Sequence, residues 1–135
     1  MSETLIGVLV GGLLSGLGTW IAIGVQHKRW VLETRITRLN AKRERLEAAY
    51  EETLKQLLKG MSEGNYSITM MSDIDFLFPQ AVSKEFEKLM AEEDKSELNM
   101  KFHYYDIARA MKASIRNIED EIDALILGKK EKNKD

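Results

Sequence analysis

The distribution of apolar and polar positions divides this chain into two contrasting parts. From Thr4 to Val25 no residue carries a charge, and as a helix at 1.5 Å per residue the stretch would be about 33 Å long, enough to cross a hydrocarbon core of ~30 Å. Because only a helix satisfies its own backbone hydrogen bonds in lipid, the pattern predicts a transmembrane anchor over residues 1–26. We expect the anchor to be retained, since it lacks the basic start and small-residue cleavage site of a secretory signal.

After the anchor, apolar residues recur every three or four positions, which is typical of amphipathic helices. The first such helix, 27–60, is predicted to end at Gly60, a residue type that suits a helix C-terminus. The connecting segment 61–93 contains a turn at Gly64 and a short helix with Pro79 at its first position. The heptad seam of the first helix has Arg43 at one core position, and its apolar members are Leu32, Ile36, Leu39, Leu46, Tyr50, Leu57 and Met61. The apolar face of the short helix comprises Phe78, Val82, Phe86 and Leu89.

A second long amphipathic helix is predicted over 94–128, followed by a charged tail over 129–135. Asp94 and Glu97 have the spacing of a capping box, and Gly128 is expected to end the helix. Its apolar seam consists of Leu98, Phe102, Tyr105, Ala108, Met111, Ile115, Ile118, Ile122 and Leu125.

Two long helices with matching seams predict an all-α fold. We expect one N-terminal transmembrane helix that continues into a cytoplasmic antiparallel helical hairpin or coiled coil, with a short third helix packed on it. The seam over 32–61 is equally suited to pairing with another chain, and the sequence does not choose between the two arrangements.

The border of the apolar stretch is strongly basic. Between His27 and Arg45 the chain carries seven cations and two carboxylates. The positive-inside rule therefore places the N-terminus outside and the helical body in the cytoplasm. We expect the membrane to be a bacterial inner membrane. We expect no nucleic-acid partner, since no zinc finger, helix-turn-helix or aromatic-rich sheet motif accompanies the cations. The residues predicted to contact lipid headgroups are Lys28, Arg29, Trp30, Arg35 and Arg38.

Small residues recur inside the apolar stretch at steps of three and four, so they line two neighbouring faces of one helix. Such faces let membrane helices approach closely enough for van der Waals contact to hold them together. The pattern predicts a homo-oligomer. The residues assigned to this transmembrane association are Gly7, Gly11, Gly12, Ser15, Gly16, Gly18 and Ala22.

The segment between Tyr66 and Phe78 is too apolar for a solvated linker. One interpretation is that it folds back onto the helices, and the other is that it forms an exposed patch for a protein partner. The candidate partner-binding residues are Tyr66, Ile68, Met70, Met71, Phe76 and Phe78.

Residues with catalytic or metal-binding chemistry are sparse. The chain has no Cys, which excludes disulfides and thiolate sites. His103 and Asp106 are close enough in sequence to reach one ion, but the body offers no further His. We therefore predict no metal and no cofactor. The acidic residues between Glu119 and Asp123 are interpreted as a solvated face that can meet the basic residues 38–45 in an antiparallel hairpin. No catalytic motif is present, which predicts that the protein is not an enzyme.

One span, a basic border and a small helical body together resemble many bacterial membrane proteins, including some membrane effectors of anti-phage systems. This resemblance is one of architecture and assigns no role to individual residues. The predicted function is that of a single-pass, membrane-anchored interaction or scaffold protein that self-associates and presents its body to a protein partner. The alternative is an oligomeric membrane effector that permeabilises or perturbs the bilayer.

Overall fold

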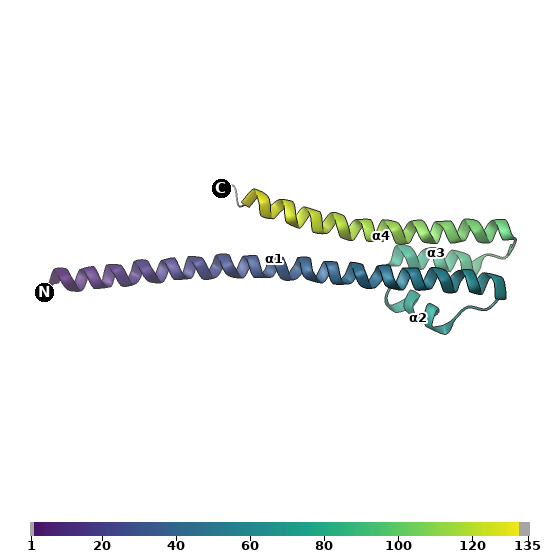
Figure 1. The fold of residues 1–135 in the computed structure, drawn as a ribbon, viewed down its shortest axis with the longest axis horizontal. Helices are drawn as coiled ribbons and strands as arrows, with labels where there is room; N and C mark the ends of the chain where they lie inside the picture. The colour runs from purple at the N-terminus through teal and green to yellow at the C-terminus, as the bar shows by residue number, and fades with distance from the viewer. Residues whose placement is uncertain (1, 133–135) are drawn as a thin grey trace. The chain divides into compact units, whose positions relative to one another are not determined.

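In the computed structural model, which describes residues 2–132, the chain is helical (Figure 1). Its helices are α1 (Ser2–Glu63), α2 (Ile68–Phe76), α3 (Gln80–Ala91) and α4 (Glu97–Lys132). No strand occurs within the described range, so the predicted all-α class is confirmed. The end of the predicted tail, 133–135, lies outside the described residues. The chain divides into two compact units, up to Arg38 and from Leu39 onward, and α1 contributes to both.

The first unit is a single stretch of helix without a covering element. Every residue from Ser2 to Val31 is exposed, including the large apolar side chains of the uncharged stretch. This unit therefore has no core of its own.

The second unit has a core that links α1, α3 and α4. The Tyr50 ring of α1 lies 4.9 Å from the Phe78 ring, which in turn lies 6.3 Å from the Phe86 ring of α3. The Tyr50 hydroxyl is 2.6 Å from Ser114 Oγ of α4, and burial raises the pKa of this phenol, so it stays protonated. The predicted apolar face of the short helix is confirmed, since its four residues are buried. The core residues are Leu46, Tyr50, Thr53, Leu57, Met70, Ile74, Phe78, Val82, Phe86, Leu89, Ile107, Met111, Ile118 and Ile122.

The C-terminal end of α1 differs from the prediction at Gly60. This glycine lies inside the helix and is buried. The Tyr66 ring covers it and occupies the space that a side chain would need. The helix ends instead before Gly64, which has a φ of 77° and donates its amide to the Gly60 carbonyl at 2.8 Å. A residue without Cβ adopts this left-handed conformation at little cost. The prediction that Gly60 ends the helix is therefore wrong.

Helix α2 was not among the predicted elements. It ends close to the start of α3, where the Ser83 hydroxyl donates to the Ile74 carbonyl at 2.8 Å and satisfies one of the free carbonyls of the last turn. Pro79 precedes α3 as its N-cap, with an extended ψ of 151°. The prediction that Pro79 is the first residue of the helix is therefore wrong.

Both ends of α4 also differ from the prediction. The backbone amide of Asn99 donates to Ser96 Oγ at 3.4 Å, so Ser96 is the capping residue. The predicted capping box of Asp94 and Glu97 is therefore wrong. The Asp94 carboxylate instead accepts the Ser96 amide at 3.1 Å. The helix continues past Gly128, because a glycine whose surroundings are open does not by itself stop a helix.

The buried face of α4 departs from the predicted seam over its first turns. The seam includes Leu98, Phe102 and Tyr105, which are exposed. Ile107, which the seam omits, is fully buried, and Met111 is buried as expected. The sequence offers apolar residues on both sides of these turns. Helix α3 packs against α4, and the buried side of α4 is the one that carries Ile107.

Candidate functional site

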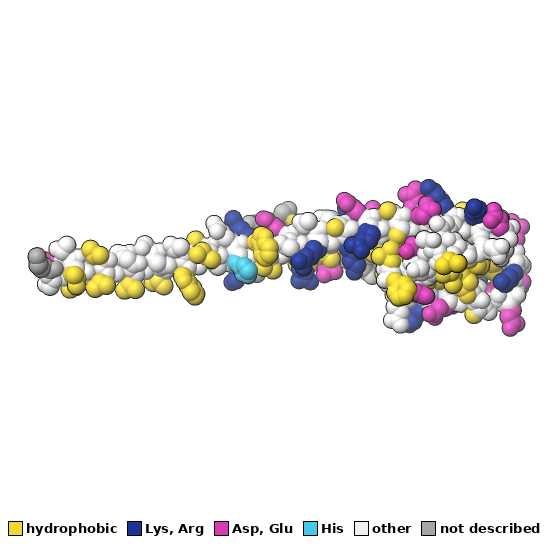
Figure 2. Space-filling model, turned by 90° about the horizontal axis from the view of Figure 1, so that it is seen from below, with side chains coloured by type: hydrophobic (Ala, Val, Ile, Leu, Met, Phe, Trp, Pro, Cys, Tyr) yellow, Lys and Arg dark blue, Asp and Glu magenta, His cyan; other side chains and the backbone are white. Residues whose placement is uncertain are grey.

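The uncharged stretch of α1 is the largest candidate surface. Among residues 2–132, α1 is the one helix that is long and apolar enough to cross a membrane. No part of its most apolar window is buried by the protein, whereas the core helix of a soluble protein would be covered. Figure 2 shows apolar side chains along this part of the helix, with Lys and Arg side chains following them.

The small residues of this stretch have open space around them. Ser15 Oγ donates to the Gly12 carbonyl at 3.1 Å, and Thr19 Oγ1 donates to the Ser15 carbonyl at 2.9 Å. The hydroxyl donors are thus satisfied within the helix. Ala22 is exposed. A Cβ added at any of these glycines would meet no atom within 4 Å: Gly7, Gly11, Gly12, Gly16 and Gly18.

The basic border follows directly on the same helix. The predicted headgroup contacts Lys28, Arg29, Trp30, Arg35 and Arg38 are all exposed. The ring of His27 stacks on that of Trp30 with centroids 6.1 Å apart. The arrangement is that of a cationic and aromatic collar, the composition found where helices meet headgroups.

The predicted partner-binding segment divides into buried and exposed residues. Met70 and Phe78 belong to the core, so they stabilise the fold and are not available to a partner. Ile68 and Phe76 are 88% and 89% exposed, and Met71 is also exposed. Tyr66 is partly buried against α1. The fold-back interpretation therefore fits Met70 and Phe78, and Ile68, Met71 and Phe76 stay candidates for partner binding.

A groove that the sequence reasoning missed lies between the end of α1 and the start of α4. Its volume is about 550 Å³. Two apolar pairs of neighbours, Leu57–Leu58 and Tyr104–Tyr105, indicate it, because adjacent residues on a helix point about 100° apart and a narrow buried face leaves one of them outside. Leu57 is buried while Leu58 is exposed. The residues lining the α1–α4 groove are Leu58, Met61, Ser62, Lys95, Glu97, Met100, Lys101, Tyr104 and Tyr105.

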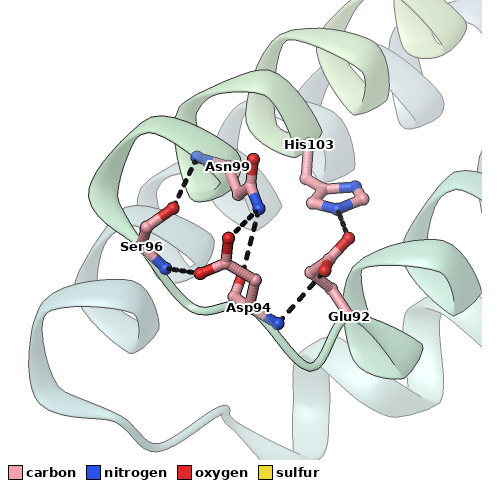
Figure 3. Close-up of polar contacts among 5 residues, drawn as sticks. All are labelled: Glu92, Asp94, Ser96, Asn99 and His103. Carbon is pink, nitrogen blue, oxygen red and sulfur yellow. Dashed lines mark hydrogen bonds and ion pairs between the residues drawn. The ribbon is translucent and has the colours of Figure 1, made fainter.

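Polar side chains gather where α3 connects to α4 (Figure 3). His103 Nε2 donates to Glu92 Oε2 at 3.0 Å, and the Asp94 amide donates to Glu92 Oε1 at 3.1 Å. The hydrogen bond from His103, followed by that from Asp94, lowers the pKa of the Glu92 carboxyl. Asn99 Nδ2 donates to Asp94 Oδ2 at 2.8 Å. These contacts close the turn between the two helices.

The residues considered for a metal do not converge. Asp106 lies 3.6 Å from Arg109, whereas His103 contacts Glu92, so the two do not share a partner. Within the part of the chain that the structure describes, no group of three or more His, Asp or Glu side chains is placed to hold an ion.

One member of the acidic cluster meets the basic part of α1. Arg43 Nη1 lies 3.9 Å from Glu119 Oε1, and Arg43 Nε lies 4.0 Å from Glu47 Oε1. Both partners of the first pair are partly exposed, and ion pairs of this kind contribute ~0.2–1 kcal/mol.

Comparisons with protein-family models, with curated proteins and with solved structures find no match for this chain. Four surfaces of the described residues bear on function. They are the exposed apolar helix, its basic border, the exposed residues of α2 and the α1–α4 groove.

Proposed function

We propose that the protein is a single-pass, membrane-anchored interaction protein whose copies associate through the small-residue face of α1. The observation that carries this proposal is the complete exposure of the apolar window of α1. Soluble monomers rarely leave contiguous apolar patches above a few hundred Å² uncovered. Lipid provides the cover that the protein itself does not.

The basic border supports an orientation with the helical body in the cytoplasm. Lys28, Arg29, Arg35 and Arg38 follow the apolar stretch within a few turns, where positive charge is retained on the cytoplasmic side. Anionic headgroups of the inner membrane attract the same residues.

The body is proposed to be an antiparallel hairpin of α1 and α4, with α3 packed on it. Two contacts support this arrangement, since Arg43 faces Glu119 and the later α1 residue Tyr50 faces the earlier α4 residue Ser114. Leu46, another residue of the α1 seam, is buried within the chain. The burial of Leu46 supports use of the seam inside one copy over coiling around another copy.

The glycine faces support association in the membrane. Without Cβ atoms, the backbones of two helices can approach closely, and van der Waals contact is the main source of affinity in lipid. The hydroxyls of Ser15 and Thr19 donate to carbonyls of their own helix, so they do not need water as a hydrogen-bond partner. This favours a lipid-facing anchor over a water-filled pore.

Native mass spectrometry of the full chain in nanodiscs tests the proposal. We expect an oligomer for the native sequence and a monomer for Gly11→Ile/Gly12→Ile, because the added side chains fill open space on the association face. The matched control is Leu13→Ile/Leu14→Ile, which keeps the volume at two exposed positions and should leave the oligomer intact. A chain that fractionates as soluble without detergent would refute the anchor, and dye leakage from liposomes would favour the bilayer-perturbing effector.

Topology is tested separately with an engineered thiol. Because the chain has no Cys, Glu93→Cys at an exposed position of the body gives one labelling site. An impermeant maleimide should label it only after the inner membrane is permeabilised. Labelling in intact spheroplasts would place the body outside.

A further inference from the structure

Helix α2 presents an apolar surface that no part of the described chain covers. We define the α2 knob as Ile68, Met71 and Phe76, all exposed, with Ile68 and Phe76 nearly as accessible as in an unfolded chain. The opposite face of the same helix is held in the core by Met70 and Ile74. The knob is therefore fixed in place, and little conformational entropy would be lost when it binds.

The α1–α4 groove is large enough to receive such a knob. A cavity of roughly 150 Å³ holds a benzene ring, and the groove measures about 550 Å³. Leu58 and Tyr105 offer exposed apolar surface along it, and Tyr104 adds a second ring. Aromatic rings in contact contribute ~0.5–1.5 kcal/mol beyond the burial of their area.

The charges of the two surfaces are complementary. Helix α2 carries Asp73 and Asp75 and no cationic side chain. The groove is lined by Lys95 and by Lys101, whose Nζ lies 3.2 Å from Glu97 Oε1, so its lining carries one net positive charge. Placing α2 in the groove of another copy brings an anionic helix to a net cationic rim, which favours this pairing over one between identical surfaces.

Membrane anchoring fits a contact between two different surfaces. Copies inserted with one topology are related by an axis along the membrane normal, and a closed ring about such an axis uses heterologous contacts. The anchor also raises the effective concentration of the bodies.

We propose that the α2 knob of one copy inserts into the α1–α4 groove of the neighbouring copy, so that the bodies associate head to tail. This inference rests on the proposed membrane association and names the protein partner of the exposed α2 residues as a second copy of this chain. Several modest contacts of this kind become a stable assembly only when the anchors hold the copies together.

Disulfide cross-linking of the full chain in membranes tests the docking. Phe76→Cys and Tyr105→Cys are made in separate chains with different tags and co-expressed, so that no chain can cross-link internally. Oxidation should yield a species that carries both tags. The matched control replaces Tyr105→Cys by Lys84→Cys, an exposed position on α3, and should lose the product. A Phe76→Cys homodimer that forms as readily as the mixed species would overturn the head-to-tail arrangement.

A charge exchange at exposed positions tests the same contact without touching the core. Asp75→Lys in the chain that carries Phe76→Cys should lower the mixed product, and Lys101→Asp in the Tyr105→Cys chain should restore it. Failure of the restoration would count against the proposed pairing. If native mass spectrometry shows an oligomer but no mixed product forms, the docking is wrong and the anchor stands. A mixed product from a chain that fractionates as soluble would support the docking and refute the anchor.

Discussion

Replacement of Gly60 by Ala has two opposite effects on the free energy of unfolding. Gly60 lies inside α1, and in a helix interior Ala is more favourable than Gly by ~0.8–1.0 kcal/mol. However, a Cβ at this position would lie 2.5 Å from Tyr66 Cδ1 and 2.9 Å from the Asn65 carbonyl oxygen. The second atom belongs to the backbone, so relief of the clash requires the turn after α1 to move.

Overpacking of this kind costs ~1–3 kcal/mol, which exceeds the gain in helix propensity. We therefore expect Gly60→Ala to lower the free energy of unfolding by about 1 kcal/mol. Gly128→Ala is the matched control, because Gly128 also lies inside a helix but has no atom within 4 Å of the Cβ position. Propensity acts alone there, and the control should raise the free energy of unfolding by up to ~1 kcal/mol.

Urea unfolding of the full chain in mild detergent, followed by far-ultraviolet circular dichroism, measures both variants. The midpoints should move in opposite directions with unchanged slopes. The reasoning is refuted if Gly60→Ala stabilises the protein as much as Gly128→Ala does. That result would mean that Tyr66 does not lie against α1.

Three further predictions concern the body. Ser114→Ala should lower the free energy of unfolding by ~1–3 kcal/mol, because it leaves the buried Tyr50 hydroxyl without its partner, and Tyr50→Phe in the same chain should recover part of the loss. Phe86→Ala, at a fully buried ring, should cost ~3–5 kcal/mol in the same urea titration; a loss below that range would indicate a loosely packed core. The pKa of Glu92 is lowered in the folded state by His103, so its contribution is present above the unfolded pKa and lost as the pH falls through the folded value. Glu92→Gln should therefore remove part of the acid-side decline in the urea midpoint, and an unchanged pH profile would contradict the pairing.

The helical class and much of the core follow from periodicity alone. The face of α3 that carries Val82, Phe86 and Leu89 is buried as its spacing predicts, because a short helix with one apolar stripe has only one way to bury it. The start of α4 has apolar residues on more than one side. There the choice between Tyr105 and Ile107 depends on where α3 lies, which local pattern does not contain.

Helix ends were less predictable because several residues compete for each one. Gly60 and Gly64 carry the same local signal, and the packing of Tyr66 decides which of them adopts the left-handed conformation. Asp94 and Ser96 are both good N-caps. The Asp94 carboxylate accepts hydrogen bonds from the Ser96 amide and from Asn99 Nδ2, and Ser96 is the residue that caps the helix.

The exposed surfaces were predictable in kind but not in detail. Spacing alone did not separate the buried from the exposed residues of 66–78, of which Met70 is buried and Phe76 is exposed. The α1–α4 groove is lined by residues far apart in sequence. The only sequence signal for it is the adjacent apolar pairs Leu57–Leu58 and Tyr104–Tyr105.

The Trp and Tyr residues lie in different parts of the chain, so tryptophan fluorescence reports only on the first part of α1. Both Trp residues, Trp20 and Trp30, are exposed on the part of α1 outside the core, and all four Tyr residues lie after Arg38. Along a helix the two indoles are separated by about 15 Å. Trp20 lies about 8 Å from the middle of the Thr4–Val25 stretch, so lipids brominated at mid-chain positions should quench it most strongly, and lipids brominated close to the headgroup should quench Trp30 most strongly. The variants Trp20→Phe and Trp30→Phe each keep one indole, and their quenching profiles together report the depth of the helix in a bilayer.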